Sequence, residues 1–172
     1  MSLLEIGVKD GASLRTWKSY FRRGRIFGID IDPASRRSEE SRISVEVGSQ
    51  DDLPFLRACF GRNPTFDIII DDGSHINEMI IDSFQYLFNE RLATGGLYVI
   101  EDLRCSYEKL QTEQHVLEVW PGMKYNARNK SFDNDRDLMN KFFLKQIDQL
   151  DHRSGNIRLV HFWSMICIIE KA

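Results

Sequence analysis

The fold class that the sequence predicts is α/β: a doubly wound, mostly parallel sheet of seven strands that ends in an antiparallel hairpin. Short apolar segments alternate along the chain with segments whose apolar residues recur at helical spacing. That alternation is typical of a parallel sheet covered by helices on both faces. Only a tight break separates the last two apolar segments, which predicts the terminal hairpin.

The apolar segments predict seven strands. They lie at Leu3–Gly7, Arg25–Ile29, Ile43–Val47, Ile68–Ile70, Leu97–Ile100, Ile157–Phe162 and Ser164–Ile169. Helices are expected over residues 13–20, 53–60, 77–89 and 135–150. Ser13 is a candidate N-cap for the first helix, and Asp51 or Asp52 is a candidate for the second. Thr94–Gly96 predicts a turn before the fifth strand.

The 172 residues are expected to form one domain, residues 1–172, with a substantial core. A net charge of -3 without a basic face argues against nucleic acid as a partner, and no apolar stretch is long enough to cross a membrane. The three scattered cysteines fit neither a zinc site nor a disulfide framework, so a cytoplasmic location is expected. A homo-oligomer stays open. Almost nothing precedes the first strand, so either the chain is trimmed or the fold needs no amino-terminal helix.

The first predicted strand ends in a glycine turn that suits a nucleotide-like ligand. Glu5, Gly7 and Gly11 are spaced Glu-x-Gly-x-x-x-Gly, and a missing Cβ permits close approach to the backbone. The middle glycine of the dinucleotide fingerprint is absent, so a pyrophosphate is expected to fit poorly. By itself the motif is weak, because a plain glycine turn would show the same spacing.

Further candidate contacts for such a ligand follow the second and third strands. Asp30 ends the second strand, where an acid can accept hydrogen bonds from both ribose hydroxyls. Asp32 is better explained as a turn residue. Ser49 and Gln50 follow the third strand, where small polar residues could border an adenine ring.

A concentration of ionisable residues lies at the ends of the fourth and fifth strands. Asp71, Asp72 and His75 follow the fourth strand, and Glu101 and Asp102 follow the fifth. Ligands of open α/β sheets bind beyond the carboxyl ends of the strands, so these side chains converge if the two strands are neighbours. As a structural alternative, Asp72 caps the next helix and His75 lies in its first turn. Asp71 is either a buried structural acid or a backbone contact for a cofactor.

Taken together, these motifs resemble the class I S-adenosylmethionine-dependent methyltransferases, which have a Rossmann-like sheet. Asp71–His75 and Ile100–Leu103 resemble more closely the metal-dependent sugar O-methyltransferases of the mycinamicin type and the cephalosporin-hydroxylase-like group. The expected contacts of S-adenosylmethionine are Glu5, Gly7, Gly11, Asp30, Ser49, Gln50 and Asp71. The resemblance also implies Mg²⁺ held by Asp72, Glu101 and Asp102, with His75 as the catalytic base.

The expected reaction is methyl transfer to a hydroxyl of a sugar or a glycosylated small molecule. An aliphatic hydroxyl must be polarised or deprotonated first; Mg²⁺ binds hard oxygen ligands, and a neutral histidine can take the proton. Residues 104–134 show no clear period and are expected to form an irregular lid or acceptor region. Two alternatives stay open. A nicotinamide-dependent oxidoreductase is disfavoured by the missing glycine and the carboxylate cluster; the other is a non-catalytic cofactor-binding or assembly module.

Overall fold

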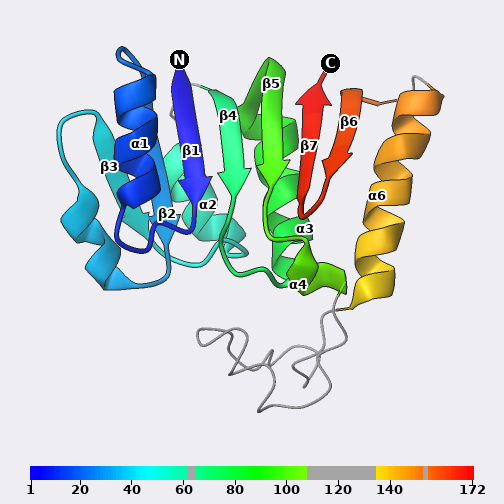
Figure 1. The fold of residues 1–172 in the computed structure, drawn as a ribbon, viewed down its shortest axis with the longest axis horizontal. Coiled ribbons are helices and arrows are strands. Elements are labelled where there is room, and N and C mark those ends of the chain that lie inside the picture. The colour runs from blue at the N-terminus through cyan, green and yellow to red at the C-terminus, as the bar shows by residue number, and fades with distance from the viewer. Residues whose placement is uncertain (62–64, 108–134, 153–154) are drawn as a thin grey trace.

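The computed structural model describes residues 1–61, 65–107, 135–152 and 155–172. The described residues form one seven-stranded sheet in the order β3-β2-β1-β4-β5-β7-β6 (Figure 1). The strands are β1 (Ser2–Ile6), β2 (Arg25–Asp30), β3 (Ile43–Val47), β4 (Phe66–Asp71), β5 (Leu92–Ile100), β6 (Ile157–Trp163) and β7 (Ile166–Lys171). β1 to β5 pair in parallel, whereas β7 runs antiparallel to both of its neighbours, β5 and β6. The predicted α/β class, the mostly parallel sheet and the closing hairpin are therefore confirmed.

Helices cover both faces of this sheet. They are α1 (Ala12–Tyr20), the 3-10 helix η1 (Pro33–Ser38), α2 (Leu53–Phe60), α3 (Asn77–Tyr86), the π-helix η2 (Leu87–Arg91), α4 (Arg104–Tyr107) and α6 (Arg136–Asp151). Leu3 of β1 packs in one cluster with Leu14 of α1, while Leu4 packs in a second cluster with α2, α3 and α6. Successive strand side chains point to opposite faces, so the two clusters are the two sides of a doubly wound sheet.

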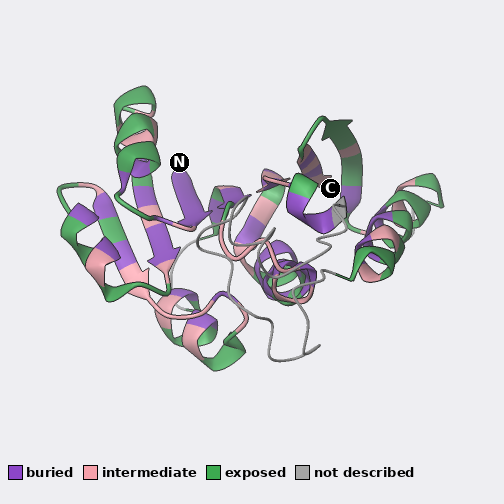
Figure 2. Cartoon of the chain, turned by 60° about the horizontal axis from the view of Figure 1, so that its bottom comes forward, coloured by how far each residue is buried: buried purple, intermediate pink, exposed green. Residues whose placement is uncertain are grey.

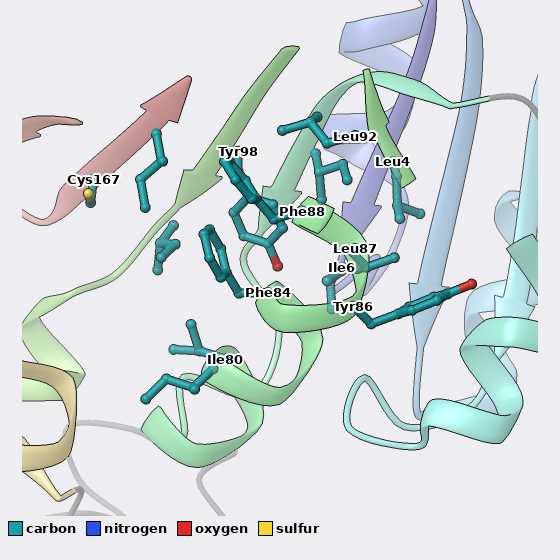
Figure 3. Close-up of a cluster of buried hydrophobic side chains, with 14 of the residues drawn as sticks. Leu4, Ile6, Ile80, Phe84, Tyr86, Leu87, Phe88, Leu92, Tyr98 and Cys167 are labelled. Atoms are coloured by element: carbon teal, nitrogen blue, oxygen red, sulfur yellow. The ribbon is translucent and has the colours of Figure 1, made fainter. Parts of the chain in front are cut away.

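The larger cluster holds α3 against β5. Figure 3 shows its aromatic centre, in which the ring of Phe84 stacks on Phe88 and meets the edge of Tyr98. All three side chains are buried, and burying a side chain of this size stabilises the fold by roughly 1.5–3 kcal/mol. Buried positions concentrate on the central strands, and exposed positions lie on the outer surfaces of the helices and on β6 (Figure 2). The end of α3 is thereby packed against β5.

The expected caps agree with the structure at the second helix and differ at the first. Asp52 caps α2, because its carboxylate accepts a hydrogen bond from the backbone N–H of Phe55 at 3.1 Å. The prediction for Ser13 is wrong: the N-cap of α1 is Gly11, whose φ of 74° is left-handed. The hydroxyl of Ser13 instead donates to the carboxylate of Glu5, which draws it away from the helix end.

Two predicted boundaries also differ from the structure. β5 begins at Leu92, so Thr94–Gly96 lies inside the strand rather than in a turn before it. Between two paired positions, β4 advances from residue 66 to 68 while β5 advances from 92 to 97, and the extra residues bulge out of the register. The helix expected over 77–89 is divided, since α3 ends at Tyr86 and continues as the π-helix η2.

The expected acceptor region at 104–134 lies outside the described residues from position 108 onward. In the parts of the chain that the structure describes, we find no helix with the length and apolar character needed to span a bilayer.

Candidate active site

The carboxyl ends of β1, β2, β4 and β5 lie along one edge of the sheet, the lower edge in Figure 1, because these strands are parallel. They border a cavity of about 640 Å³. Backbone pairing continues to the strand ends, where Asp72 N donates to Ile6 O at 3.0 Å and Glu101 N donates to Asp71 O at 2.9 Å. The backbone that carries the expected site residues is therefore held by the sheet itself.

Gly7, which follows β1, lies against the backbone that follows β4. Its φ is 91°, and a Cβ added there would lie 2.1 Å from the carbonyl oxygen of Asp72. No side chain fits such a contact without moving the backbone of Asp72, just after β4. Gly11 is also left-handed, but it faces Ser38 and lies outside the cavity lining. Of the two glycines in the first motif, Gly7 is the one that shapes the cavity.

Asp30 lines the cavity and also holds the loop between β1 and α1. Its Oδ2 accepts hydrogen bonds from the backbone N–H groups of Val8 at 2.8 Å and Lys9 at 2.7 Å, and its Oδ1 accepts one from Asp32 at 2.8 Å. A carboxylate oxygen can accept two hydrogen bonds, so Oδ1 retains capacity for a ligand hydroxyl. The expected ribose contact at Asp30 stays a prediction, and the geometry leaves room for it.

Glu5 points into the protein rather than into the cavity. Its side chain is buried and accepts hydrogen bonds from the hydroxyl of Ser13 and from Nε1 of Trp17, the latter at 2.7 Å. Burial is the largest influence on this carboxyl group and raises its pKa to about 7. A role for Glu5 at the cofactor would therefore be exerted through α1.

The three remaining expected cofactor contacts differ in position. Ser49 lines the cavity, and its hydroxyl donates to Asp51. Gln50 is buried at the cavity wall, with both ends of its amide engaged by protein atoms. The carboxylate of Asp71 is buried among polar partners, including Gln50 and Tyr98, and burial raises its pKa to about 6. Its side chain is the structural acid that the sequence left as an alternative.

Asp72, His75 and Asp102 come together at the ends of β4 and β5. Each offers one potential ligand atom, and these atoms all lie within 4.8 Å of one another. Nε2 of His75 is 3.8 Å from Oδ2 of Asp102. Glu101 lies beside this group but is not one of its three members. The structure thus assembles three of the four residues expected to converge, from two adjacent strands.

Desolvation and like charge perturb these groups in the directions expected of a cation site. Burial, followed by the charge of Asp102, raises the pKa of Asp72 to about 6, and the Lys9 ammonium opposes the shift. Burial, followed by Asp72 and Asp102, raises the pKa of Glu101. Burial lowers the pKa of His75 against the opposing pull of Asp102 and Glu101. A neutral imidazole therefore stands beside carboxylates that repel one another.

Backbone conformation marks the same region. Lys9, His75 and Asp102 have φ values of 53°, 55° and 52°, in the left-handed region that residues other than glycine seldom adopt. All three line the cavity. Strained backbone of this kind persists where surrounding structure holds it, and it clusters at functional sites. No pattern in the sequence announces these angles, and Lys9 was not among the expected site residues.

The structure resembles solved methyltransferases. The MycE methyltransferase from the mycinamycin biosynthetic pathway, in complex with Mg and SAH, superposes with a TM-score of 0.76 at 33% identity, covering 99% of this chain and 44% of that chain. A second MycE structure, in complex with Mg, SAH and mycinamycin VI, gives a TM-score of 0.75 at 35% identity. Less similar is a protein from Staphylococcus aureus, at 15% identity and a TM-score of 0.66, which supports the fold alone.

The curated relatives of this chain are O-methyltransferases. The 8-demethyl-8-alpha-L-rhamnosyl tetracenomycin-C 2'-O-methyltransferase of Streptomyces olivaceus is 35% identical over 191 residues, covering 99% of this chain and 46% of the relative. The demethylmacrocin O-methyltransferase of Streptomyces fradiae is 45% identical over 127 residues, covering 70% of this chain and 29% of the relative.

The chain spans less than half the length of these relatives. No protein-family model matches it. The sequence comparison and the structural comparison nevertheless both lead to methyltransferases. The chain has the fold of the class I S-adenosylmethionine-dependent methyltransferases and is homologous to part of the O-methyltransferases that include MycE.

Proposed function

We propose that this chain carries the methyl-transfer site of an S-adenosylmethionine-dependent, Mg²⁺-assisted O-methyltransferase. The observation that carries the proposal is that Asp72, His75 and Asp102 lie together in the lining of a cavity that Asp30 also lines. Residues 1–172 are taken as one unit of this enzyme. MycE, bound to Mg and SAH in its solved structures, supports both the donor and the metal.

The ends of β1 and β2, here called the cofactor half, fit the methyl donor. Gly7 and Gly48 both line the cavity, and neither carries a side chain that would occupy it. Asp30 retains an acceptor for a ribose hydroxyl, and Ser49 borders the space beyond it. S-adenosylmethionine would supply the methyl group from this half.

The ends of β4 and β5, here called the metal half, fit a hard divalent cation. Mg²⁺ binds oxygen at about 2.0–2.1 Å, so two ligand atoms on opposite sides lie about 4 Å apart. The potential ligand atoms of Asp72 and Asp102 lie within 4.8 Å of each other, which is comparable with that separation. Glu101 would join them directly or through a water molecule. When bound, Mg²⁺ supplies a Lewis acid that lowers the pKa of a hydroxyl in contact with it.

His75 is the residue that would take the hydroxyl proton. Burial lowers the pKa of its imidazole, so the ring is neutral near pH 7, the form that can accept a proton. Asp102, with its Oδ2 3.8 Å from Nε2, would stabilise the imidazolium that forms. The proton thus moves from the acceptor oxygen to His75 while the carboxylates hold their positions.

The acceptor in this proposal is a hydroxyl of a sugar or a glycosylated small molecule. The relatives' names support this class, since they include an enzyme acting on a rhamnosyl tetracenomycin and an L-olivosyl-oleandolide 3-O-methyltransferase. A vicinal diol could contact the cation on the side that the carboxylates leave open.

Calorimetry separates this proposal from the two alternatives. The protein should bind S-adenosylhomocysteine and not a nicotinamide dinucleotide. It should also release or absorb heat on binding Mg²⁺, and this signal should be lost in the Asp72→Asn variant. A mass-spectrometric screen of glycosylated acceptors should then show a gain of one methyl group that chelation abolishes. Binding of the dinucleotide alone would support an oxidoreductase. Binding of S-adenosylhomocysteine and Mg²⁺ without turnover on any hydroxyl acceptor would support a non-catalytic module.

A further inference from the structure

The loop between β4 and α3 carries two members of the metal half, Asp72 and His75, yet it has no regular secondary structure. His75 is held at a left-handed φ of 55°. In the middle of this loop, the backbone N–H of Ser74 donates to Oε1 of Gln50 at 2.8 Å. Gln50 follows β3 and reaches the loop across 24 positions of sequence. A buried side chain from another part of the sheet therefore supports the loop at its centre.

The orientation of the Gln50 amide is determined by what lies behind it. Its Nε2 is 3.1 Å from each carboxylate oxygen of Asp71 and 3.2 Å from Oγ of Ser83. An ionised carboxylate only accepts hydrogen bonds, so the amide nitrogen faces Asp71 and the amide oxygen faces Ser74. Gln50 is 4% exposed and Asp71 is 1% exposed, so water does not substitute for either partner.

Gln50 also fixes how closely the loop approaches the sheet. A Cβ on Gly73 would lie 2.4 Å from Oε1 of Gln50 and 2.8 Å from Cγ2 of Ile6. The backbone of the loop therefore rests directly on the Gln50 amide, with no space for a larger residue between them. A shift of this amide would move the residues on either side of Gly73.

We propose that Gln50 is a positioning residue, which holds the 72–75 loop so that Asp72 and His75 face Asp102, and that Asp71 sets its orientation. The proposal rests on the proposed function for the roles of Asp72 and His75. It assigns Gln50 a task different from the adenine contact expected from the sequence. Asp71 accepts a hydrogen bond from the amide nitrogen of Gln50 and so orients the amide, whose oxygen accepts one from the backbone N–H of Ser74.

The test reverses donor and acceptor in this pair. Gln50→Glu keeps the shape of the side chain but puts a carboxylate against Asp71, which removes the donor and adds like charge. Its Mn²⁺ dissociation constant should rise by about 10-fold or more, a loss of roughly one charge-assisted hydrogen bond. Amides 72–76 should exchange with solvent faster, while the affinity for S-adenosylhomocysteine changes by less than about 3-fold.

A second change should restore what the first removes. In the Gln50→Glu/Asp71→Asn double variant, the new amide donates to the new carboxylate, which still accepts from Ser74 N. Mn²⁺ affinity and exchange of amides 72–76 should both return toward the wild-type values. A side chain that serves only to fill the core would show neither the loss nor the rescue of Mn²⁺ affinity, because both substitutions keep the volume of the side chain.

Gln146 of α6 provides a matched control. It is also 4% exposed, and its Nε2 donates to Phe142 O at 2.9 Å within the helix, outside the cavity lining. Gln146→Glu should lower the melting temperature as Gln50→Glu does, with Mn²⁺ affinity unchanged. Wild-type exchange and Mn²⁺ affinity in Gln50→Glu, or a double variant no better than the single one, would overturn the proposal. A wild-type protein that binds no Mn²⁺ would instead count against the proposed function, while amide exchange would still test the Gln50 contact.

Discussion

At the ends of β1 and β2, the carboxylate of Asp30 accepts hydrogen bonds from backbone N–H groups, whereas at the ends of β4 and β5 carboxylates face one another. The cofactor half is therefore complete within the protein, because its charge is already matched by donors. The metal half is not: the pKa of Asp72 is raised to about 6 by burial and by Asp102. A site of the first kind is preformed, and a site of the second kind gains stability when a cation arrives.

The largest expected effect would separate the two halves by chemistry. His75→Ala should reduce turnover by about 10²–10⁴-fold, the usual contribution of a general base. The affinity for S-adenosylhomocysteine should not change, because the imidazole belongs to the metal half. His152→Ala, at an exposed position after α6, is the control and should be neutral. Steady-state rates with calorimetric binding would check both, and weakened cofactor binding in His75→Ala would show that the halves are not independent.

Gly7 should affect both halves, because it follows β1 in the cofactor half and lies against the backbone of Asp72 in the metal half. Gly7→Ala combines a strained φ with a Cβ 2.1 Å from Asp72 O, which should lower the free energy of unfolding by about 2–5 kcal/mol. Gly95→Ala has a similar φ of 75° but nothing within 4 Å, so only the strain of about 1–2 kcal/mol applies. Urea unfolding of the two variants isolates the close contact. Equal losses would mean that the approach of β4 to Gly7 is unimportant.

The buried acid of the cofactor half should appear in the pH dependence of stability. The pKa of Glu5 is raised from 4.5 to about 7 by burial, so between these values the folded protein holds more of this proton than the unfolded chain. Stability therefore falls as the pH rises through that window, by at most about 3 kcal/mol for this group. Glu5→Gln should flatten that part of the urea-unfolding profile, and the exposed Glu90→Gln should not. A slope that Glu5→Gln leaves intact would assign the effect to other carboxyl groups.

The smallest expected effect concerns affinity within the cofactor half. Asp30→Ala removes one ribose acceptor and the support of Val8 and Lys9, with each lost hydrogen bond contributing about 0.5–1.5 kcal/mol. S-adenosylhomocysteine should bind roughly 10-fold more weakly, while Mn²⁺ binding stays near the wild-type value. Asp32→Ala, which loses only its hydrogen bond from Ala34 N, should leave both unchanged. Cofactor affinity equal to wild type in Asp30→Ala would place the ribose elsewhere.

The sequence was informative where strand ends carry chemistry. The abrupt change from Ile68–Ile70 to acidic residues located the end of β4, and the parallel order of the sheet brought Asp72, His75 and Asp102 together. These inferences succeed because a parallel sheet places all its carboxyl ends at one edge. The resemblance to sugar O-methyltransferases pointed to the same residues.

Other features depended on contacts that no local pattern encodes. The hydrogen bonds of Gln50 are not predictable from local sequence, because its partners Asp71 and Ser83 are 21 and 33 positions away. The local sequence predicts Ser13 as the cap of α1. That prediction fails because the competing acceptor on Glu5 becomes a neighbour only in the folded protein. The left-handed φ values of His75 and Asp102 arise in the same way, from tertiary packing that overrides local preference.

The place of β7 between β5 and β6 has a consequence for how the protein is synthesised. β7 pairs with β5 along Leu97–Ile100, and the backbone N–H of Leu103 donates to Met165 O in the turn that precedes β7. The last strand in chain order is thus the one that completes the sheet beside Asp102. Until residues 166–171 leave the ribosome, the apolar edge of β5 has no partner strand, and open edges of this kind invite pairing with other chains. Until β7 is available, β5 and β6 both lack this partner strand.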